Sequence, residues 1–155
     1  MKKRIAVAGS SNMDVVLSVK KAPEQGETVL VNSQRFIPGG KGANRAVALA
    51  RLGADPLFSC CLGDDAFAET LLDVYKAENM DRSLMRKISN EATGTAYIFV
   101  EETGKNRISV YSGANAEYGE ADICALVNRF DEISMVNAEL EIPPEAVERL
   151  IKECC

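Results

Sequence analysis

The sequence predicts an α/β fold in which helices cover a parallel sheet. Short apolar runs at residues 4–8 and 57–62 are typical of strands buried on both faces. Apolar residues at helical spacing follow over 41–52 and again over about 64–78. An order of strand, helix, strand and helix is what a parallel sheet with crossover helices requires.

The first third of the chain also predicts a pair of strands outside this alternation. Residues 4–8 end at a glycine, and a turn then leads to a strand at 15–19. Residues 27–36 alternate between polar and apolar side chains, which predicts a second strand antiparallel to the first. The helix at 41–52 follows, and Gly53 is placed to terminate it as a C-cap.

The middle of the chain predicts a helix and a hairpin. After the strand at 57–62, Asp64 is a candidate N-cap for the helix that runs to about residue 78. Residues 95–102 and 106–112 are rich in β-branched and aromatic side chains and are separated by a short loop containing glycine. We expect this hairpin to join the small sheet and not the main one.

The last elements are a weakly patterned helix at 120–130, a strand at 133–138 and a helix at 144–152 that begins at a pair of prolines. A helix in a parallel α/β unit buries its apolar face beneath the strand that follows it. No strand follows the last helix in this sequence. We therefore expect the chain to be part of a larger domain, with an apolar face left uncovered.

Composition limits the classes of function. The 155 residues are 46% hydrophobic and 26% charged with a net charge of −5, which suits one globular domain over 1–155. The acidic balance argues against nucleic acid and anionic membranes as partners, because both attract clustered lysine and arginine. No apolar stretch approaches the roughly 20 residues of a membrane span.

Cysteine and histidine usage narrows the chemistry. The five cysteines are odd in number and show no C-x-x-C spacing, which favours a reducing cytoplasm. The sequence has no histidine, so zinc sites built on histidine and Ser-His-Asp nucleophiles are excluded. Any catalysis rests on carboxylates, lysine or bound cofactors.

A glycine-rich segment at 39–44 precedes the helix at 41–52. Consecutive glycines allow close approach of a ligand to the backbone, and a helix N-terminus offers free N–H groups. The spacing is not that of a Walker A loop, and Arg45 stands where a dinucleotide-binding G-x-G-x-x-G segment has its last glycine. Taken alone, the segment is more simply interpreted as a turn and a helix start.

Polar side chains lie where strands of the main sheet end. Asn12 and Asp14 follow the first strand, at the edge where open α/β sheets bind ligands. An amide and a carboxylate two residues apart suit neighbouring hydroxyl groups, although an Asx-turn without a ligand explains them as well. Glu141 follows the strand that begins at residue 133, and a solvated loop charge is its alternative interpretation.

Several segments, in this order, resemble the ribokinase-like (pfkB) family of carbohydrate kinases over the whole chain. Residues 39–46, followed by Gly53 and Gly63, are similar to the N-terminal signature of that family. Four further segments match it, namely 9–14, 23–28, 93–96 and 112–116. The resemblance implies a three-layer α/β/α sheet with a small β-sheet lid, built from segments at about 14–37 and 95–112.

The resemblance also implies function. It implies ATP-dependent phosphorylation of D-ribose to D-ribose 5-phosphate, with Mg²⁺ and a monovalent cation such as K⁺, in a homodimer that packs through the lid. This chain would be the N-terminal half and would hold the sugar, because no Gly-Ala-Gly-Asp motif for the catalytic base is present. The sugar-binding residues implied are Asn12, Met13, Asp14, Gly40, Lys41, Gly42, Ala43, Asn44, Ala96, Ile108 and Glu141.

Two alternatives to a ribose kinase remain open at this point. The family includes kinases for deoxyribose, fructose and nucleosides, and Asp14 and Glu141 suit any sugar rich in hydroxyls. The chain could also be a non-catalytic module that binds sugar or dimerises. Ala96 and Ile108 have a simpler interpretation as ordinary strand residues.

Overall fold

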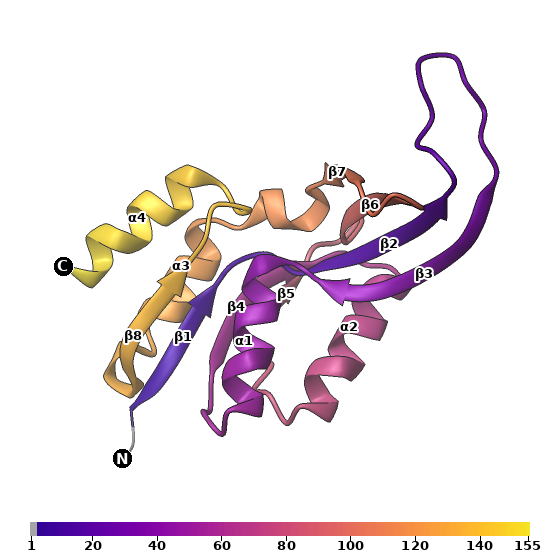
Figure 1. The fold of residues 1–155 in the computed structure, drawn as a ribbon. Helices are drawn as coiled ribbons and strands as arrows, with labels where there is room; N and C mark the ends of the chain where they lie inside the picture. Colours follow the sequence, from indigo (N-terminus) through magenta and orange to yellow (C-terminus); the bar gives the residue numbers. More distant parts are fainter. Residues whose placement is uncertain (1–2) are drawn as a thin grey trace.

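The main sheet is parallel and has four strands within residues 3–155, the range that the computed structural model describes (Figure 1). Its strands in spatial order are β5 (Met85–Lys87), β4 (Leu57–Leu62), β1 (Arg4–Ala8) and β8 (Ile133–Ala138). The first two residues of the predicted domain lie outside the described range. The predicted strands at 4–8, 57–62 and 133–138 are confirmed, whereas β5 is too short and too polar to show a strand pattern.

Helices cover both faces of this sheet, as Figure 1 shows. One face carries α1 (Lys41–Arg51) and α2 (Ala66–Ala77), and the other carries α3 (Glu120–Val127) and α4 (Pro144–Cys154). Strand β4 supplies both cores, because successive side chains of a strand point to opposite faces. Leu57 packs with Leu150 of α4, and Phe58 packs edge-on against Tyr75 of α2 with 5.6 Å between ring centroids. The predicted α/β class is confirmed.

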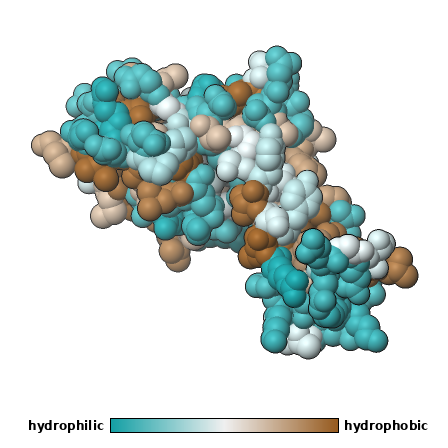
Figure 2. Space-filling view, turned by 90° about the horizontal axis from the view of Figure 1, so that it is seen from above, coloured by the Kyte–Doolittle hydropathy of each residue, from teal (hydrophilic) through white to brown (hydrophobic). Residues whose placement is uncertain are grey.

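A second sheet extends to one side of the main sheet (Figure 1). Its strands in spatial order are β3 (Val31–Gly39), β2 (Asn12–Val19), β6 (Gly94–Glu101) and β7 (Asn106–Tyr111). The predicted antiparallel pairing of β2 with β3 is confirmed, and the β6–β7 hairpin joins this smaller sheet as expected. The loop between β2 and β3 protrudes from the molecule, and hydrophobic residues gather near its base on the face seen in Figure 2.

Several predicted boundaries need correction. Strand β2 begins at Asn12 and not at residue 15, and β3 covers Val31–Gly39 and not 27–36. The N-cap of α2 is Asp65 and not Asp64, because the Asp65 carboxylate accepts a hydrogen bond of 2.9 Å from the N–H of Ala68. The predicted helix at 120–130 divides into α3 and a short 3₁₀ helix, Phe130–Glu132. A second 3₁₀ helix, Gly113–Glu117, follows β7.

The ends of the helices also bear on the predictions. Gly53 follows α1 with φ of +80°, so the predicted glycine C-cap is confirmed. The last helix buries part of its apolar face, since Ala146 and Leu150 pack against Ile123 and Leu126 of α3, whereas Ile151 is 57% exposed. Apolar exposure is also found at side chains such as Met135 of β8. Within residues 3–155 no helix combines the length and apolar character needed to cross a bilayer.

Candidate functional site

Glycines bring the start of α1 directly onto the loop that follows β1. Gly40 has φ of +95°, and a Cβ atom there would lie 2.8 Å from the carbonyl oxygen of Ser10 and 2.9 Å from the nitrogen of Asn12. A Cβ atom on Gly42 would lie 2.6 Å from the carbonyl carbon of Gly9. All three distances are shorter than real Cβ contacts, so these two positions require glycine for the backbones to meet.

The N–H groups at the start of α1 already have partners within the protein. The Lys41 N–H donates to the Glu141 carboxylate at 3.1 Å, the Gly42 N–H to the Ser10 hydroxyl at 3.4 Å, and the Ala43 N–H to the Ser10 carbonyl at 2.9 Å. The expectation that this helix start offers free N–H groups is therefore wrong. Because Glu141 supplies the anion that a helix N-terminus attracts, the segment is no phosphate cradle.

Glu141 lies at the centre of a polar cluster. Its carboxylate pairs with the Lys41 ammonium at 2.9 Å and accepts from the Ser10 hydroxyl at 2.7 Å. Burial alone would raise the pKa of Glu141, but the hydrogen bonds from Lys41 and Ser10 outweigh it and the net pKa is lowered. Hydrogen bonding to Glu141 raises the pKa of Lys41. Both groups are therefore held in their charged forms.

A second glutamate, Glu139, fixes the backbone around Glu141. One of its carboxylate oxygens accepts from the Ser10 N–H at 2.6 Å and the other from the Glu141 N–H at 2.5 Å. Its side chain is buried, so its two oxygens are satisfied by the loops that carry the site. Glu139 is not among the predicted site residues, because nothing in the local sequence pattern distinguishes it from a loop charge.

Asp14 faces the same region from β2 and is less well satisfied. Burial, and then the neighbouring Glu141 carboxylate, raises the pKa of Asp14 above its usual value. A Cβ atom on Gly39 would lie 2.4 Å from one Asp14 oxygen, so the glycine at the end of β3 leaves room for this carboxylate. Asp14 is the site carboxylate with unused capacity to accept hydrogen bonds.

These groups surround an open hollow of about 180 Å³ at the carboxyl end of β1. Its lining residues are Asn12, Asp14, Gly40, Lys41, Asn44, Ala96, Ile98, Ile108, Val110 and Glu141. All predicted sugar-binding residues except Met13, Gly42 and Ala43 are in this set. Ile98 and Val110 were not predicted. Each lies two residues from a predicted residue, Ala96 on β6 and Ile108 on β7, and therefore on the same face of the sheet.

The three predicted residues outside the lining have positions that support the hollow. Met13 and Ala43 are buried in the core between the main sheet and α1, where both belong to the cluster around Phe58. Gly42 is covered by the backbone of Gly9. Direct contact of these three residues with a ligand stays a prediction.

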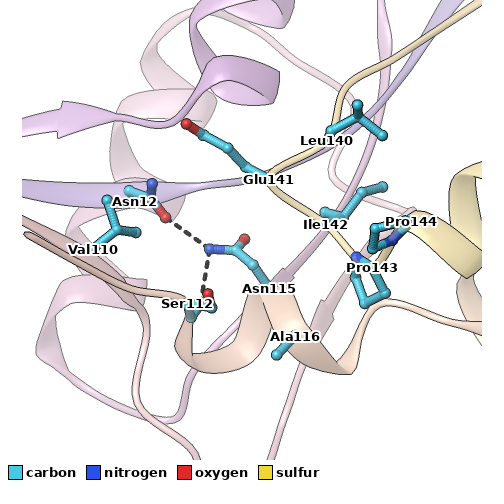
Figure 3. A pocket seen from close by; sticks show the side chains of 10 residues that line it. All are labelled: Asn12, Val110, Ser112, Asn115, Ala116, Leu140, Glu141, Ile142, Pro143 and Pro144. Atoms are coloured by element: carbon cyan, nitrogen blue, oxygen red, sulfur yellow. Dashed lines mark hydrogen bonds between the residues drawn. The ribbon is translucent and has the colours of Figure 1, made fainter.

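A second hollow of about 370 Å³ adjoins the first and shares Asn12, Val110 and Glu141 with it (Figure 3). Its other lining residues are Ser112, Asn115, Ala116, Leu140, Ile142, Pro143 and Pro144. The shared residues join the two hollows into one recess between the main sheet and the second sheet. Within residues 3–155, no group of three or more acidic or cysteine side chains is arranged to hold a metal ion.

The recess combines hydrogen-bonding side chains on one side with apolar strands on the other. Asp14 and the amides can accept or donate to hydroxyl groups, and Lys41 can donate. The apolar face of β6 and β7 suits the carbon side of the same ligand. Fold and recess together define an α/β protein with a hollow at the carboxyl end of its parallel sheet, polar on one side and apolar on the other.

Comparison with known proteins identifies the family. The model of the pfkB family of carbohydrate kinases matches residues 2–154. A ribokinase from Bacillus subtilis (strain 168) is 39% identical over 152 residues, which is 98% of this chain and 52% of that protein. A deoxyribokinase from Salmonella typhi is 30% identical over 148 residues, which is 96% of this chain and 48% of that protein.

Solved structures agree with this assignment. The structure of Arabidopsis thaliana ribokinase complexed with ribose and ATP matches with a TM-score of 0.86 at 27% identity, over 99% of this chain and 50% of that one. The chain belongs to the pfkB family of carbohydrate kinases, so the resemblance seen in the sequence is confirmed. It spans about half the length of the curated relatives it matches.

Proposed function

We propose that this chain forms the sugar-binding part of a kinase that converts ATP and D-ribose to ADP and D-ribose 5-phosphate. The observation that carries this proposal is the hollow in which Asn12, Asp14, Lys41 and Glu141 meet at the carboxyl end of β1. The similarity to the Bacillus subtilis ribokinase over nearly the whole chain supports it.

Recognition of the sugar rests on hydrogen bonds to its hydroxyl groups. Asp14 accepts from one hydroxyl, while Lys41 and the amides of Asn12 and Asn44 donate to others. The pair of Glu141 with Lys41 fixes the position of the ammonium group. A molecule without the matching hydroxyls leaves the buried Asn12 and the half-buried Asp14 unpaired, which is how such a site rejects it.

The second sheet acts as a lid over the sugar. Ala96, Ile98, Ile108 and Val110 supply an apolar wall on the side of the hollow opposite the polar cluster. Closure of such a wall excludes water, which otherwise competes with the sugar as acceptor of the phosphoryl group. The segments assigned to this lid are those of β2, β3, β6 and β7.

The start of α1 offers no free cradle for the phosphates of ATP. The N–H groups of Lys41, Gly42 and Ala43 donate to Glu141 and Ser10 within the protein. We therefore assign ATP, Mg²⁺, K⁺ and the catalytic base to parts of the kinase beyond the matched half. The half-length coverage of relatives supports this assignment.

A homodimer through the lid is part of the proposal. Ile37, Ile108 and Val110 lie on the face of the second sheet that borders the hollow, and all three are more than 40% exposed. Such exposed apolar side chains on one sheet face favour contact with a second copy. Ile37→Lys should lower the dimer fraction in sedimentation velocity, whereas Leu52→Lys, at an exposed apolar residue after α1, should not.

We place the protein in a reducing cytoplasm. The cysteines at 60, 61, 124, 154 and 155 are all free thiols, in keeping with that assignment. Burial raises the pKa of Cys61 to about 12, so this thiol stays protonated and inert at neutral pH.

Calorimetric titration with D-ribose, 2-deoxyribose, fructose and a nucleoside tests the substrate assignment. We expect D-ribose to bind most tightly and binding to be lost in Asp14→Ala. Preference for 2-deoxyribose would favour the second candidate, which the similarity to a deoxyribokinase supports. Glu120→Ala, at an exposed residue of α3 away from the hollow, is the control variant.

A kinase assay tests whether this chain binds the sugar while the remaining half of the kinase supplies the catalytic base. With Mg·ATP and ribose, we expect turnover from the complete kinase and none from the 155-residue chain alone. Turnover by the chain at a rate comparable to a complete relative would contradict the assignment of the catalytic base to the remaining half. Ribose binding without turnover in any longer form would instead favour a non-catalytic sugar-binding module.

A further inference from the structure

Asn115 is a buried amide next to the site and has a complete set of partners. It belongs to the 3₁₀ helix Gly113–Glu117, and only 2% of the residue is exposed. Its Oδ1 accepts from the Ser11 N–H at 2.9 Å. Its Nδ2 donates to the Asn12 Oδ1 at 2.7 Å and to the Ser112 carbonyl at 3.0 Å (Figure 3).

These partners allow only one orientation of the Asn115 amide. Turning the group by 180° would place its oxygen against the Ser112 carbonyl and its NH₂ against the Ser11 N–H. Two acceptors and two donors would then face each other in a buried place, where unpaired polar groups are expensive. The backbone therefore fixes Asn115 with its NH₂ toward Asn12.

The orientation of Asn115 in turn fixes the Asn12 amide. The NH₂ of Asn115 needs an acceptor, so the Asn12 oxygen faces it and the Asn12 nitrogen points away, as drawn in Figure 3. Within residues 3–155, the Asn12 Nδ2 makes no hydrogen bond to another protein group, and it is not among the fully buried unsatisfied atoms. The part of Asn12 left for a ligand is a hydrogen-bond donor.

Gly94 provides an independent sign that the chain is built around this pair. It lies opposite Asn12 in the register of β2 with β6. A Cβ atom at this position would lie 2.1 Å from the Asn115 Nδ2 and 2.3 Å from the Asn12 Oδ1. Any residue other than glycine would force the two amides apart. The first residue of β6 thus preserves the hydrogen bond between Asn115 and Asn12.

We propose that Asn115 is a positioning residue that makes Asn12 a dedicated donor in the sugar site. Asn12 and Asp14 are two apart on β2 and line the same hollow, so a donor and an acceptor stand side by side. This pair selects two neighbouring hydroxyl groups, of which one accepts from Asn12 and the other donates to Asp14. The inference rests on the proposed function, because it assigns a polarity to the same sugar site.

Asn115→Asp is the decisive variant, since it keeps the shape and removes the NH₂. The new carboxylate needs a donor, so Asn12 turns its nitrogen inward and presents its oxygen to the ligand. We expect the dissociation constant for D-ribose, measured by calorimetry, to rise at least tenfold. In an Asn12→Ala background, the same change should have no further effect, because Asn115 acts through Asn12.

A second variant and a spectroscopic measurement cover the case in which Asn115→Asp fails to fold. Gly94→Ala should weaken ribose binding in the same way, while Gly119→Ala, where the nearest atom to an added Cβ is 3.9 Å away, should not. In the wild-type ¹H–¹⁵N spectrum, the Asn115 side-chain NH₂ should exchange slowly with water. The Asn12 NH₂ should exchange fast and shift when D-ribose is added.

The possible outcomes separate this inference from the proposed function. Two results would overturn the positioning role and leave the proposed function intact. One is a ribose affinity of Asn115→Asp equal to that of the wild type. The other is a loss of affinity from Asn115→Asp that is equally large in the Asn12→Ala background. Absence of ribose binding in the wild type would count against the proposed function instead. In that case, slow exchange of the Asn12 NH₂ would refute the free donor as well, and fast exchange would support it.

Discussion

Replacement of Gly39 by alanine offers a sharp test of the role of Asp14. The added Cβ atom would lie 2.4 to 2.5 Å from all three atoms of the Asp14 carboxyl group, about an ångström inside contact distance. Gly39 does not have a positive φ, so alanine can adopt its backbone conformation. The carboxylate at the end of a rotatable side chain therefore moves, and the strand stays in place.

The expected effect falls on binding and not on stability. Displacing the carboxylate removes one hydrogen bond between a charged acceptor and a sugar hydroxyl, which contributes about 1.5 to 3 kcal/mol. The dissociation constant for D-ribose should then rise roughly 10- to 150-fold. Alanine also reduces the freedom of the unfolded chain by about 0.4 to 1 kcal/mol where the backbone tolerates it, so the melting temperature should not fall.

Calorimetric titration and thermal melting of the same samples measure both effects. Asp14→Ala sets the largest loss expected, and Gly119→Ala controls for adding a methyl group to a glycine with open space around it. Wild-type affinity in Gly39→Ala would show that the Asp14 carboxylate does not contact the sugar from its present position. A melting temperature far below that of the wild type would show that the backbone, and not the side chain, yields to the methyl group.

Three further predictions concern charge and packing. The folded state raises the pKa of Asp14, through burial and then Glu141, so stability from this group is present at low pH and is lost as pH rises through the folded-state pKa. At pH 7, Asp14→Asn should therefore have a melting temperature equal to or above that of the wild type, yet bind ribose more weakly. In the wild type, the affinity for ribose should fall at acidic pH as Asp14 becomes protonated. Leu71→Ala, at a fully buried residue of α2, should lower the free energy of unfolding by about 2 to 5 kcal/mol in urea titrations. Arg86→Met should lower it by about 2 to 3 kcal/mol, because the nearly buried Asp122 loses two hydrogen bonds of 2.7 Å, although Arg86 itself reaches solvent.

Each of these predictions has an outcome that contradicts it. A lower melting temperature for Asp14→Asn at pH 7 would mean that the carboxylate is stabilised in the fold. A loss below about 1 kcal/mol for Leu71→Ala would indicate that α2 collapses into the space left behind. If Arg86→Met and the double variant with Asp122→Asn were equally stable, the buried charge would not explain the loss.

The elements of the main sheet could be predicted because burial on both faces leaves a clear pattern. Residues 57–62 are all buried in β4, so the run is apolar throughout apart from Ser59, whose hydroxyl is bonded to the Tyr118 hydroxyl at 2.9 Å. The start of β2 could not be predicted in this way. Asn12 and Asp14 line the hollow and are polar. Their side chains therefore interrupt the apolar pattern by which the start of β2 could be recognised in the sequence.

Contacts between distant segments explain other errors. Asp64 and Asp65 are equivalent N-cap candidates when only local sequence is considered. Thr93 decides between them, because its hydroxyl and N–H donate to the Asp65 carboxylate at 2.7 and 2.8 Å across 28 residues of chain. Glu139 and Asn115 were not predicted as site residues for the same reason, since their importance arises from hydrogen bonds to the loop after β1.

The candidate site itself could be found from sequence only through several matched segments together. No single segment identified it, and the glycine-rich start of α1 taken alone suggested an anion site that Glu141 already fills. The role of the four glycines near the hollow depends on what faces them. At Gly39 and Gly94 an added Cβ would meet polar side chains, whereas at Gly40 and Gly42 it would meet backbone.

The distribution of satisfied and unsatisfied groups explains how a stable fold can keep a site ready for a sugar. Glu141 and Asn115 have their hydrogen-bond partners within the protein, which offset the cost of burying them, so they hold their neighbours in place. Among the buried and half-buried side chains of the hollow, the unmet capacity lies on Asp14 and on the Asn12 NH₂, and the raised pKa of Asp14 reflects the unfavourable placement of its charge. A hydroxyl that donates to Asp14 removes part of that disadvantage at the moment of binding, so the least stable feature of the site is also the one that a sugar improves most.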